Sequence, residues 1–118
     1  MLRATVAASL LAALVFTLSA VASAPPVGPL PKGPVTSIST SKGTLVSVAL
    51  PSRAGKSWRL ARVVNPHVLV QVSEASVGSA VVIVYRAVAP GSVSVRYGLT
   101  IGEQRKAYAS ATFNVRVR

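Results

Sequence analysis

The chain has 118 residues, with 13 lysines and arginines against two acidic residues, no cysteine and a formal net charge of +11. The length fits one compact domain, and the lack of cysteine excludes disulfide bonds and a lipid-modified cysteine anchor, so that core burial alone must stabilise the fold. The positive charge favours acidic partners, such as a polyanion, an anionic surface or an acidic protein.

Residues 1–22 have the form of a secretory signal peptide. Arg3 gives a positive start, residues 4–18 are an apolar run, and small residues follow at Ala20, Ala22 and Ala24. A transmembrane anchor is the alternative, but the run is shorter than the roughly 20 apolar residues that a spanning helix needs. We expect cleavage after Ala22, because cleavage after Ala24 would leave a proline as the first residue. The mature protein is then secreted or periplasmic.

Residues 23–34 contain five prolines and two glycines. Proline at this density removes hydrogen-bond donors and forces an extended backbone, which excludes a helix or a central strand. The segment is predicted to be a proline-rich linker that spaces the domain from its N-terminus.

Residues 35–118 alternate short β patterns with turn signals. Strands are predicted at residues 35–40, 44–50, 58–64, 68–72, 79–89, 92–99 and 107–118. The period of two assigns an inward face to each strand; Val68, Val70 and Val72 form one such face. Trp58, the only tryptophan, is predicted to anchor the core. Seven short strands predict an all-β, immunoglobulin-like β-sandwich, with a small barrel as the alternative.

Strand alternation places three connections at the same end of the predicted sandwich, namely residues 51–57, 73–78 and 100–106. They contain the cations Arg53, Lys56, Arg105 and Lys106, against Glu74 and Glu103, so this end is expected to be net positive. The connection at residues 51–57 reads either as a solvated loop or as a binding loop mounted on a rigid scaffold.

The residues offer little for catalysis. His67 is the only histidine and there is no aspartate to orient it, and Glu74 and Glu103 are both expected in loops. These three residues are a thin ligand set for zinc, and no glycine-rich phosphate loop is present. Nucleic-acid binding would need exposed stacking aromatics, and only Tyr108 is expected outside the core. We therefore expect no enzyme activity, no cofactor, no small-molecule substrate and a monomer.

Several segments between residues 44 and 117 resemble the chagasin-like inhibitors of cysteine peptidases. Leu50-Pro51-Ser52 followed by Gly55 and Trp58 resembles the loop between the second and third strands of that family, and Gly78 stands where its second loop is glycine-rich. The match continues through Ala89-Pro90-Gly91, Val95-Arg96-Tyr97 and residues 113–117. Arg53-Ala54 replaces the threonines of the family's first loop, and its Arg-Pro-Trp motif after the sixth strand has no counterpart.

The resemblance implies an immunoglobulin-like domain that inserts three loops into the cleft of a papain-like cysteine peptidase. The implied contact residues are Arg53, Gly55, Lys56, Trp58, Gly78, Thr100, Ile101, Gly102, Arg105 and Lys106. The alternative is a non-enzymatic envelope or extracellular binding module that uses the positive end to hold an acidic protein or a polyanion.

Overall fold

A computed structural model of the protein describes residues 25–118, and the predicted signal peptide lies outside these residues. The described part is all-β. Its seven strands are β1 (Val35–Thr40), β2 (Leu45–Pro51), β3 (Ser57–Leu60), β4 (Leu69–Val77), β5 (Ala80–Ala87), β6 (Gly91–Thr100) and β7 (Ala109–Val117). Across residues 25–118, no helix is long and apolar enough to cross a membrane.

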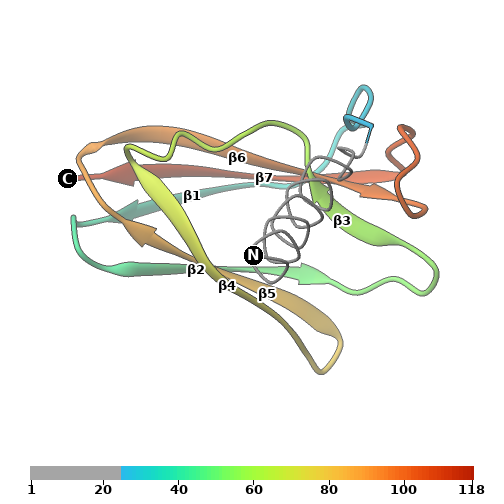
Figure 1. Cartoon of the computed structure of the whole chain (residues 1–118), viewed down its shortest axis with the longest axis horizontal. Coiled ribbons are helices and arrows are strands. Elements are labelled where there is room, and N and C mark those ends of the chain that lie inside the picture. The colour runs from blue at the N-terminus through green and yellow to red at the C-terminus, as the bar shows by residue number, and fades with distance from the viewer. Residues whose placement is uncertain (1–24) are drawn as a thin grey trace, which may run out of the picture.

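The strands form two sheets rather than one closed barrel, which confirms the predicted sandwich (Figure 1). One sheet has the order β1-β7-β6-β3 and the other has the order β2-β5-β4. All pairs are antiparallel except β1 and β7, which run parallel. Because β6 and β7 lie at the centre of their sheet and β5 at the centre of the other, these three strands carry most of the core.

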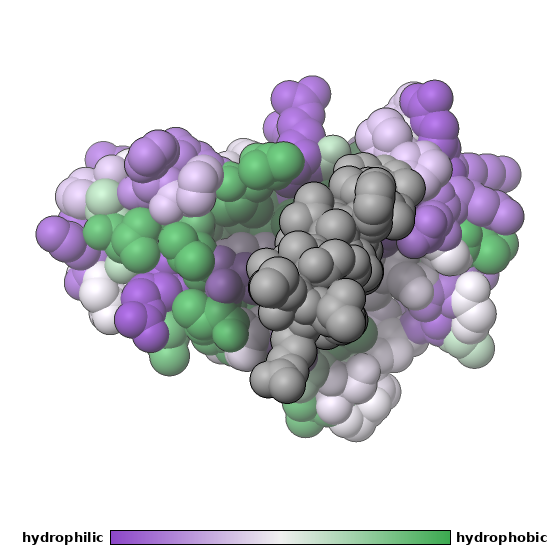
Figure 2. Space-filling model, viewed as in Figure 1, coloured by the Kyte–Doolittle hydropathy of each residue, from purple (hydrophilic) through white to green (hydrophobic). Residues whose placement is uncertain are grey.

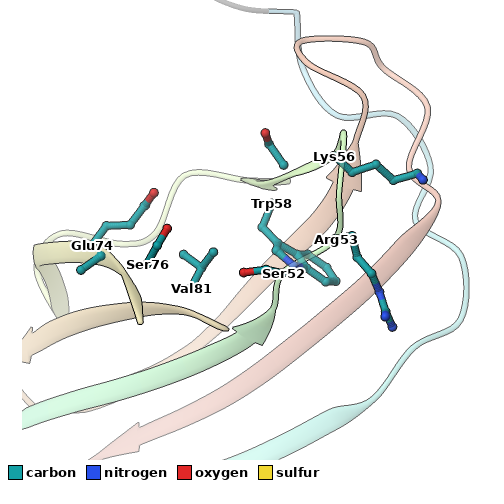
Figure 3. Close-up of a pocket in the computed structure, with 9 residues that line it drawn as sticks. Ser52, Arg53, Lys56, Trp58, Glu74, Ser76 and Val81 are labelled. Atoms are coloured by element: carbon teal, nitrogen blue, oxygen red, sulfur yellow. The ribbon is translucent and has the colours of Figure 1, made fainter. Parts of the chain in front are cut away.

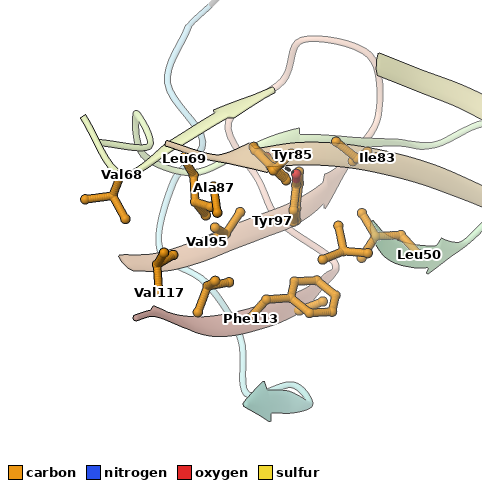
Figure 4. Packing of buried hydrophobic residues seen from close by; sticks show 13 residues of the cluster. Leu50, Val68, Leu69, Ile83, Tyr85, Ala87, Val95, Tyr97, Phe113 and Val117 are labelled. Carbon is orange, nitrogen blue, oxygen red and sulfur yellow. Dashed lines mark hydrogen bonds between the residues drawn. The ribbon is translucent and has the colours of Figure 1, made fainter. Parts of the chain in front are cut away.

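The core between the sheets follows from the alternation of apolar residues. On β2, Val46, Val48 and Leu50 are buried while the residues between them are exposed. The predicted inward faces of β5, β6 and β7 are also confirmed, and their side chains interdigitate with those of β2 (Figure 4). Their buried members include Ile83, Tyr85, Val95, Tyr97, Leu99, Ala111, Phe113, Val115 and Val117.

Two tyrosines join the sheets at the centre of this core. Tyr85 on β5 and Tyr97 on β6 are 1% and 2% exposed, and their hydroxyl groups share a hydrogen bond (Figure 4). Burial raises the pKa of both phenols, so both are neutral at physiological pH. Phe113 packs edge-on against Tyr97, with ring centroids 6.2 Å apart. Each hydroxyl therefore satisfies the other where water has no access.

Replacing Tyr97 with phenylalanine is expected to lower the free energy of unfolding by about 1–2 kcal/mol, because the buried Tyr85 hydroxyl loses its partner. The double variant Tyr85→Phe/Tyr97→Phe removes both polar groups, and its stability should lie closer to the parent than the sum of the two single effects. Urea denaturation of the four proteins measures this coupling. Strictly additive effects would show that the two hydroxyls do not stabilise one another.

Most predicted strand boundaries lie within two residues of the observed ones, but the ends of two strands are wrong by more. The strand expected at residues 58–64 ends at Leu60. The last hydrogen bond to β6 follows directly, from the Ala61 N–H to the Arg96 carbonyl at 2.8 Å, and the chain then leaves the sheet. A turn then leads into the next strand. In this turn the Asn65 carbonyl accepts hydrogen bonds from the N–H groups of Val68 and Leu69. The strand expected at residues 68–72 continues to Val77.

The predicted inward face of this fourth strand is also wrong. Val68, just before the strand, is buried as predicted, but Leu69 is buried as well, and Val70 and Val72 are 39% and 45% exposed. β4 is an edge strand with a bulge between Gln71 and Ser73, and the edge strand of the facing sheet, β3, has only four residues. Val70 pairs with the exposed Arg86 and so lies on the outer face of the sheet, and Val72 stands in the bulge. These valines therefore do not mark a core face.

The predicted linker does not project as a spacer in its described part. Residues 25–34 lie against the outer face of the β1-β7-β6-β3 sheet, where the Ser110 hydroxyl donates to the Pro31 carbonyl at 2.6 Å and the Thr112 N–H donates to the Pro34 carbonyl at 3.0 Å. Glycines permit this close packing. A Cβ on Gly98 would lie 2.7 Å from the Val27 side chain, which is too close for any larger residue without rearrangement.

Candidate functional site

Three connections between strands lie at one end of the sandwich, which we call the apex: the β2–β3 loop (52–56), the β4–β5 turn (78–79) and the β6–β7 loop (101–108). β2 and β6 run toward this end in Figure 1, and the hydrophilic side chains gathered there are visible in Figure 2. The Ser52 N–H donates to the Ser79 carbonyl at 2.8 Å, which joins the first loop to the turn. The β2–β3 and β6–β7 loops meet at Tyr108.

The β2–β3 loop is a tight, exposed turn fixed at its base. The Lys56 N–H donates to the Arg53 carbonyl at 3.1 Å, and Gly55 at the tip has a φ of +73°, a conformation that other residues rarely adopt. At the base, the Trp58 indole N–H donates to the Pro51 carbonyl at 2.8 Å while the ring packs against the core. Trp58 is thus half-buried, so the predicted anchor also holds the loop closed.

The second connection is shorter than predicted. Residues 73–77 belong to β4, and only Gly78 and Ser79 form the turn. Gly78, the first residue of the turn, has a φ of +61°, whereas Ser79, the second, does not have a positive φ. A two-residue turn with a positive φ only at its first residue is of type II′. The sequence did not predict this part of β4 because residues 70–77 are exposed on both faces, so buried and exposed residues do not alternate along it.

The β6–β7 loop is braced by Arg59, which lies outside the predicted set. Its guanidinium donates to the Gln104 carbonyl at 2.6 Å, to the Pro25 carbonyl at 2.7 Å and to the Thr100 hydroxyl at 3.1 Å. The Thr100 hydroxyl in turn donates to the Gly102 carbonyl at 2.8 Å. The Gly28 N–H also donates to the Arg105 carbonyl at 2.7 Å, so residues 25–34 support the same loop.

Cations from two of the connections converge on one aromatic ring. The ammonium groups of Lys56 and Lys106 lie 5.3 and 4.9 Å from the centroid of the Tyr108 ring, within the range of cation–π attraction. Tyr108 is 43% exposed, so the ring and both ammonium groups form part of the outer surface. This contact joins the first loop to the third.

A polar cleft of about 380 Å³ lies between the β2–β3 loop and the β4–β5 hairpin (Figure 3). Ser52, Arg53 and Lys56 line one side, with Trp58 at the base, and Glu74 on β4 lines the opposite side. The cleft is therefore lined by two cationic residues and one acidic residue, and the charged ends of Arg53 and Lys56 point away from Glu74 (Figure 3). Within residues 25–118, no three histidine, aspartate or glutamate side chains gather where they could hold a metal ion.

The predicted contact residues divide by accessibility. Arg53, Gly55, Gly78, Ile101, Gly102, Arg105 and Lys106 are exposed, and Lys56 and Trp58 are half-buried. Thr100 is fully buried and supports the loop through its hydroxyl, so it cannot contact a partner directly. Sequence reasoning missed Arg59 and Tyr108. The available signal for Tyr108 was its position two residues after Lys106, which places both on one side of an extended segment.

No protein-family model matches this chain, and a search of curated proteins by sequence found no match. Solved structures do match. A cysteine protease inhibitor from Entamoeba histolytica, EhICP2, aligns with a TM-score of 0.58 and 14% identity over 75% of this chain and 99% of that chain. PbICP-C, solved in complex with falcipain-2, aligns with a TM-score of 0.48 and 12% identity over 82% of this chain and 100% of that chain. The first likeness confirms the predicted scaffold resemblance at the level of the fold.

Proposed function

We propose that the protein inhibits papain-like cysteine peptidases by inserting its apex into their active-site cleft. The observation that carries this proposal is the likeness to a cysteine protease inhibitor that covers 99% of that inhibitor's chain. The mature protein is proposed to act outside the cytoplasm, either secreted or in a periplasm, after removal of residues 1–22.

The geometry of the loop tips supports insertion. Gly55, Gly78 and Gly102 all have positive φ, and nothing lies within 4 Å of the place where a Cβ would stand on any of them. A tip without a side chain lets its backbone approach a partner closely, and backbone N–H and C=O groups can then pair with the walls of a cleft. Such a wedge blocks substrate access without any reaction, which suits a chain with few catalytic groups.

The base of each loop supports a preformed wedge. Trp58 closes the first loop, Arg59 and Thr100 brace the third, and the two loops touch at the Lys56–Tyr108–Lys106 contact. Rigid loops lose less conformational entropy on binding, which raises affinity without additional contacts. The same cations favour approach to an acidic peptidase surface.

A second candidate function rests on these cations alone. The convergence of Lys56 and Lys106 on Tyr108, with Arg53 nearby, favours a binding module that holds an acidic protein or a polyanion at the apex. The two functions differ in salt dependence. Binding by charge weakens steeply as salt rises, whereas insertion of loop backbone depends on shape.

Titration of the mature chain against papain tests the proposal. We expect reversible inhibition that persists at physiological salt, with the inhibitor recovered uncleaved and no covalent adduct by mass spectrometry. A serine peptidase such as trypsin serves as the control and should remain fully active. Absence of papain inhibition at micromolar inhibitor would refute the proposal, and inhibition present only at low salt would favour the binding module.

A further inference from the structure

The outer face of the β1-β7-β6-β3 sheet carries regular rows of polar side chains beyond the part covered by residues 25–34. Strand register aligns Ser39, Arg116 and Ser92 in one row, and Ser37, Asn114 and Ser94 in the next. All six residues are exposed. The third row contains Val35, Thr112 and Arg96, and it lies beside the docked segment. The face is therefore an ordered surface of hydroxyl, amide and guanidinium groups.

Three shallow grooves lie on this face, and neighbouring grooves share lining residues. Their volumes are about 500, 350 and 330 Å³. Asn114 lines the first two grooves and Arg96 lines the second and third, so the three form one path. The path begins beside Arg116, passes Lys32 and Arg96, and ends beside Arg62.

The cations on the path are separated by hydrogen-bonding groups. Arg116 pairs with Ser92, and Arg96 lies four residues further along β6, which places the two arginines about 13 Å apart along the strand direction. Between them, the Ser94 hydroxyl donates to the Asn114 side-chain oxygen at 2.6 Å. This bond leaves the Asn114 amide N–H groups free to face a ligand. Neither Glu74 nor Glu103, the two acids of the described chain, lines any of the grooves.

We propose that this path binds an anionic polysaccharide, one whose sugars carry carboxylate or sulfate groups. Guanidinium groups pair in a bidentate manner with such anions, and the serine and asparagine groups between them match the hydroxyl groups of the sugars. A single-stranded nucleic acid fits less well, because its bases need aromatic surfaces for stacking and no tryptophan, tyrosine or phenylalanine lines the grooves. The path lies on a sheet face and the apex at the strand ends, so both surfaces can be occupied together.

Binding to heparin and to polygalacturonate, measured by calorimetry at low salt, tests the proposal. The variant Arg96→Gln/Arg116→Gln is expected to bind at least tenfold more weakly than the parent, with a smaller salt dependence and an unchanged melting temperature. It should inhibit papain as well as the parent does. Asn114→Ala, which preserves the charge, should bind at least threefold more weakly. Binding to heparin alone or to polygalacturonate alone supports the proposal and identifies the acidic group.

The matched control is Lys42→Gln/Arg86→Gln, which removes two positive charges from exposed residues that line none of the three grooves and lie outside the apex. It should bind within threefold of the parent. Equal losses from the two double variants would show that net charge alone drives binding, and would overturn the proposal. An unchanged affinity of Asn114→Ala, or equally tight binding of an oligothymidylate through Arg96 and Arg116, would overturn the assignment to a polysaccharide. Neutral dextran should not bind.

Discussion

Replacing Gly55 with valine is expected to weaken inhibition of papain at least tenfold, which corresponds to about 1.4 kcal/mol of binding free energy. Gly55 has a φ of +73° at the tip of the β2–β3 loop. A β-branched residue is strongly disfavoured at positive φ, so the tip must change conformation, and the new side chain also stands where the backbone would approach the peptidase. The measurement is the inhibition constant of the purified variant at physiological salt.

Gly43→Val provides a matched control for the backbone strain. Gly43 lies in the β1–β2 turn at the opposite end of the sandwich and has a φ of +90°. Like Gly55, it has nothing within 4 Å of the place where a Cβ would stand. Both substitutions should therefore lower stability by a similar amount, on the order of 1–3 kcal/mol. Only the change at Gly55 should impair inhibition. If the two variants inhibit equally well, the β2–β3 loop does not enter the cleft.

Trp58→Ala is expected to lower the free energy of unfolding by about 2–3 kcal/mol, somewhat less than the roughly 3–5 kcal/mol typical of a fully buried tryptophan. The side chain is half-buried and packs against the core, and its indole N–H donates to the Pro51 carbonyl at 2.8 Å. A domain of this size has a total of only about 5–15 kcal/mol. The same change should impair papain inhibition, because the β2–β3 loop loses the bond that closes its base.

Trp58→Phe separates the two roles of the residue. Phenylalanine retains most of the packing but has no N–H, so we expect a loss of about 1 kcal/mol together with a looser β2–β3 loop. Chemical denaturation gives the stabilities, and hydrogen exchange at residues 52–56 reports on the loop. A denaturation midpoint for Trp58→Ala equal to that of the parent would show that Trp58 contributes nothing to the core.

The alternation of residues along β2, β5, β6 and β7 was sufficient to predict these strands and their inward faces. Val48, Ile83, Tyr97 and Val115 occupy the core positions that their spacing predicts. The reason is local, because a strand with one buried face repeats its apolar residues every second position whatever its partner. The positions of Gly55 and Gly78 in turns follow from the same kind of reasoning, since their φ values are open mainly to glycine.

β4 shows where this reasoning ends. Val70 and Val72 repeat with the correct period, yet Val70 pairs with the exposed Arg86 on the outer face of the sheet and Val72 stands in the bulge between Gln71 and Ser73. Periodicity describes one strand, whereas burial depends on what lies opposite it. Residues 73–77, which are exposed on both faces of β4, show no regular apolar alternation, and their assignment to a loop was wrong.

The sequence by itself determined the all-β class and the excess of positive charge, because each depends on composition or on spacing within single strands, and it favoured the sandwich over a small barrel, which the pairing of strands into two sheets then confirmed. Only the tertiary structure decided how the apex is held. Arg59 lies 34 residues from Pro25 and 45 residues from Gln104, yet it donates hydrogen bonds to the carbonyls of both. Likewise, the rows of polar groups around Asn114 join three strands. Contacts between distant segments depend on how the sheets pair and pack, which no local pattern encodes.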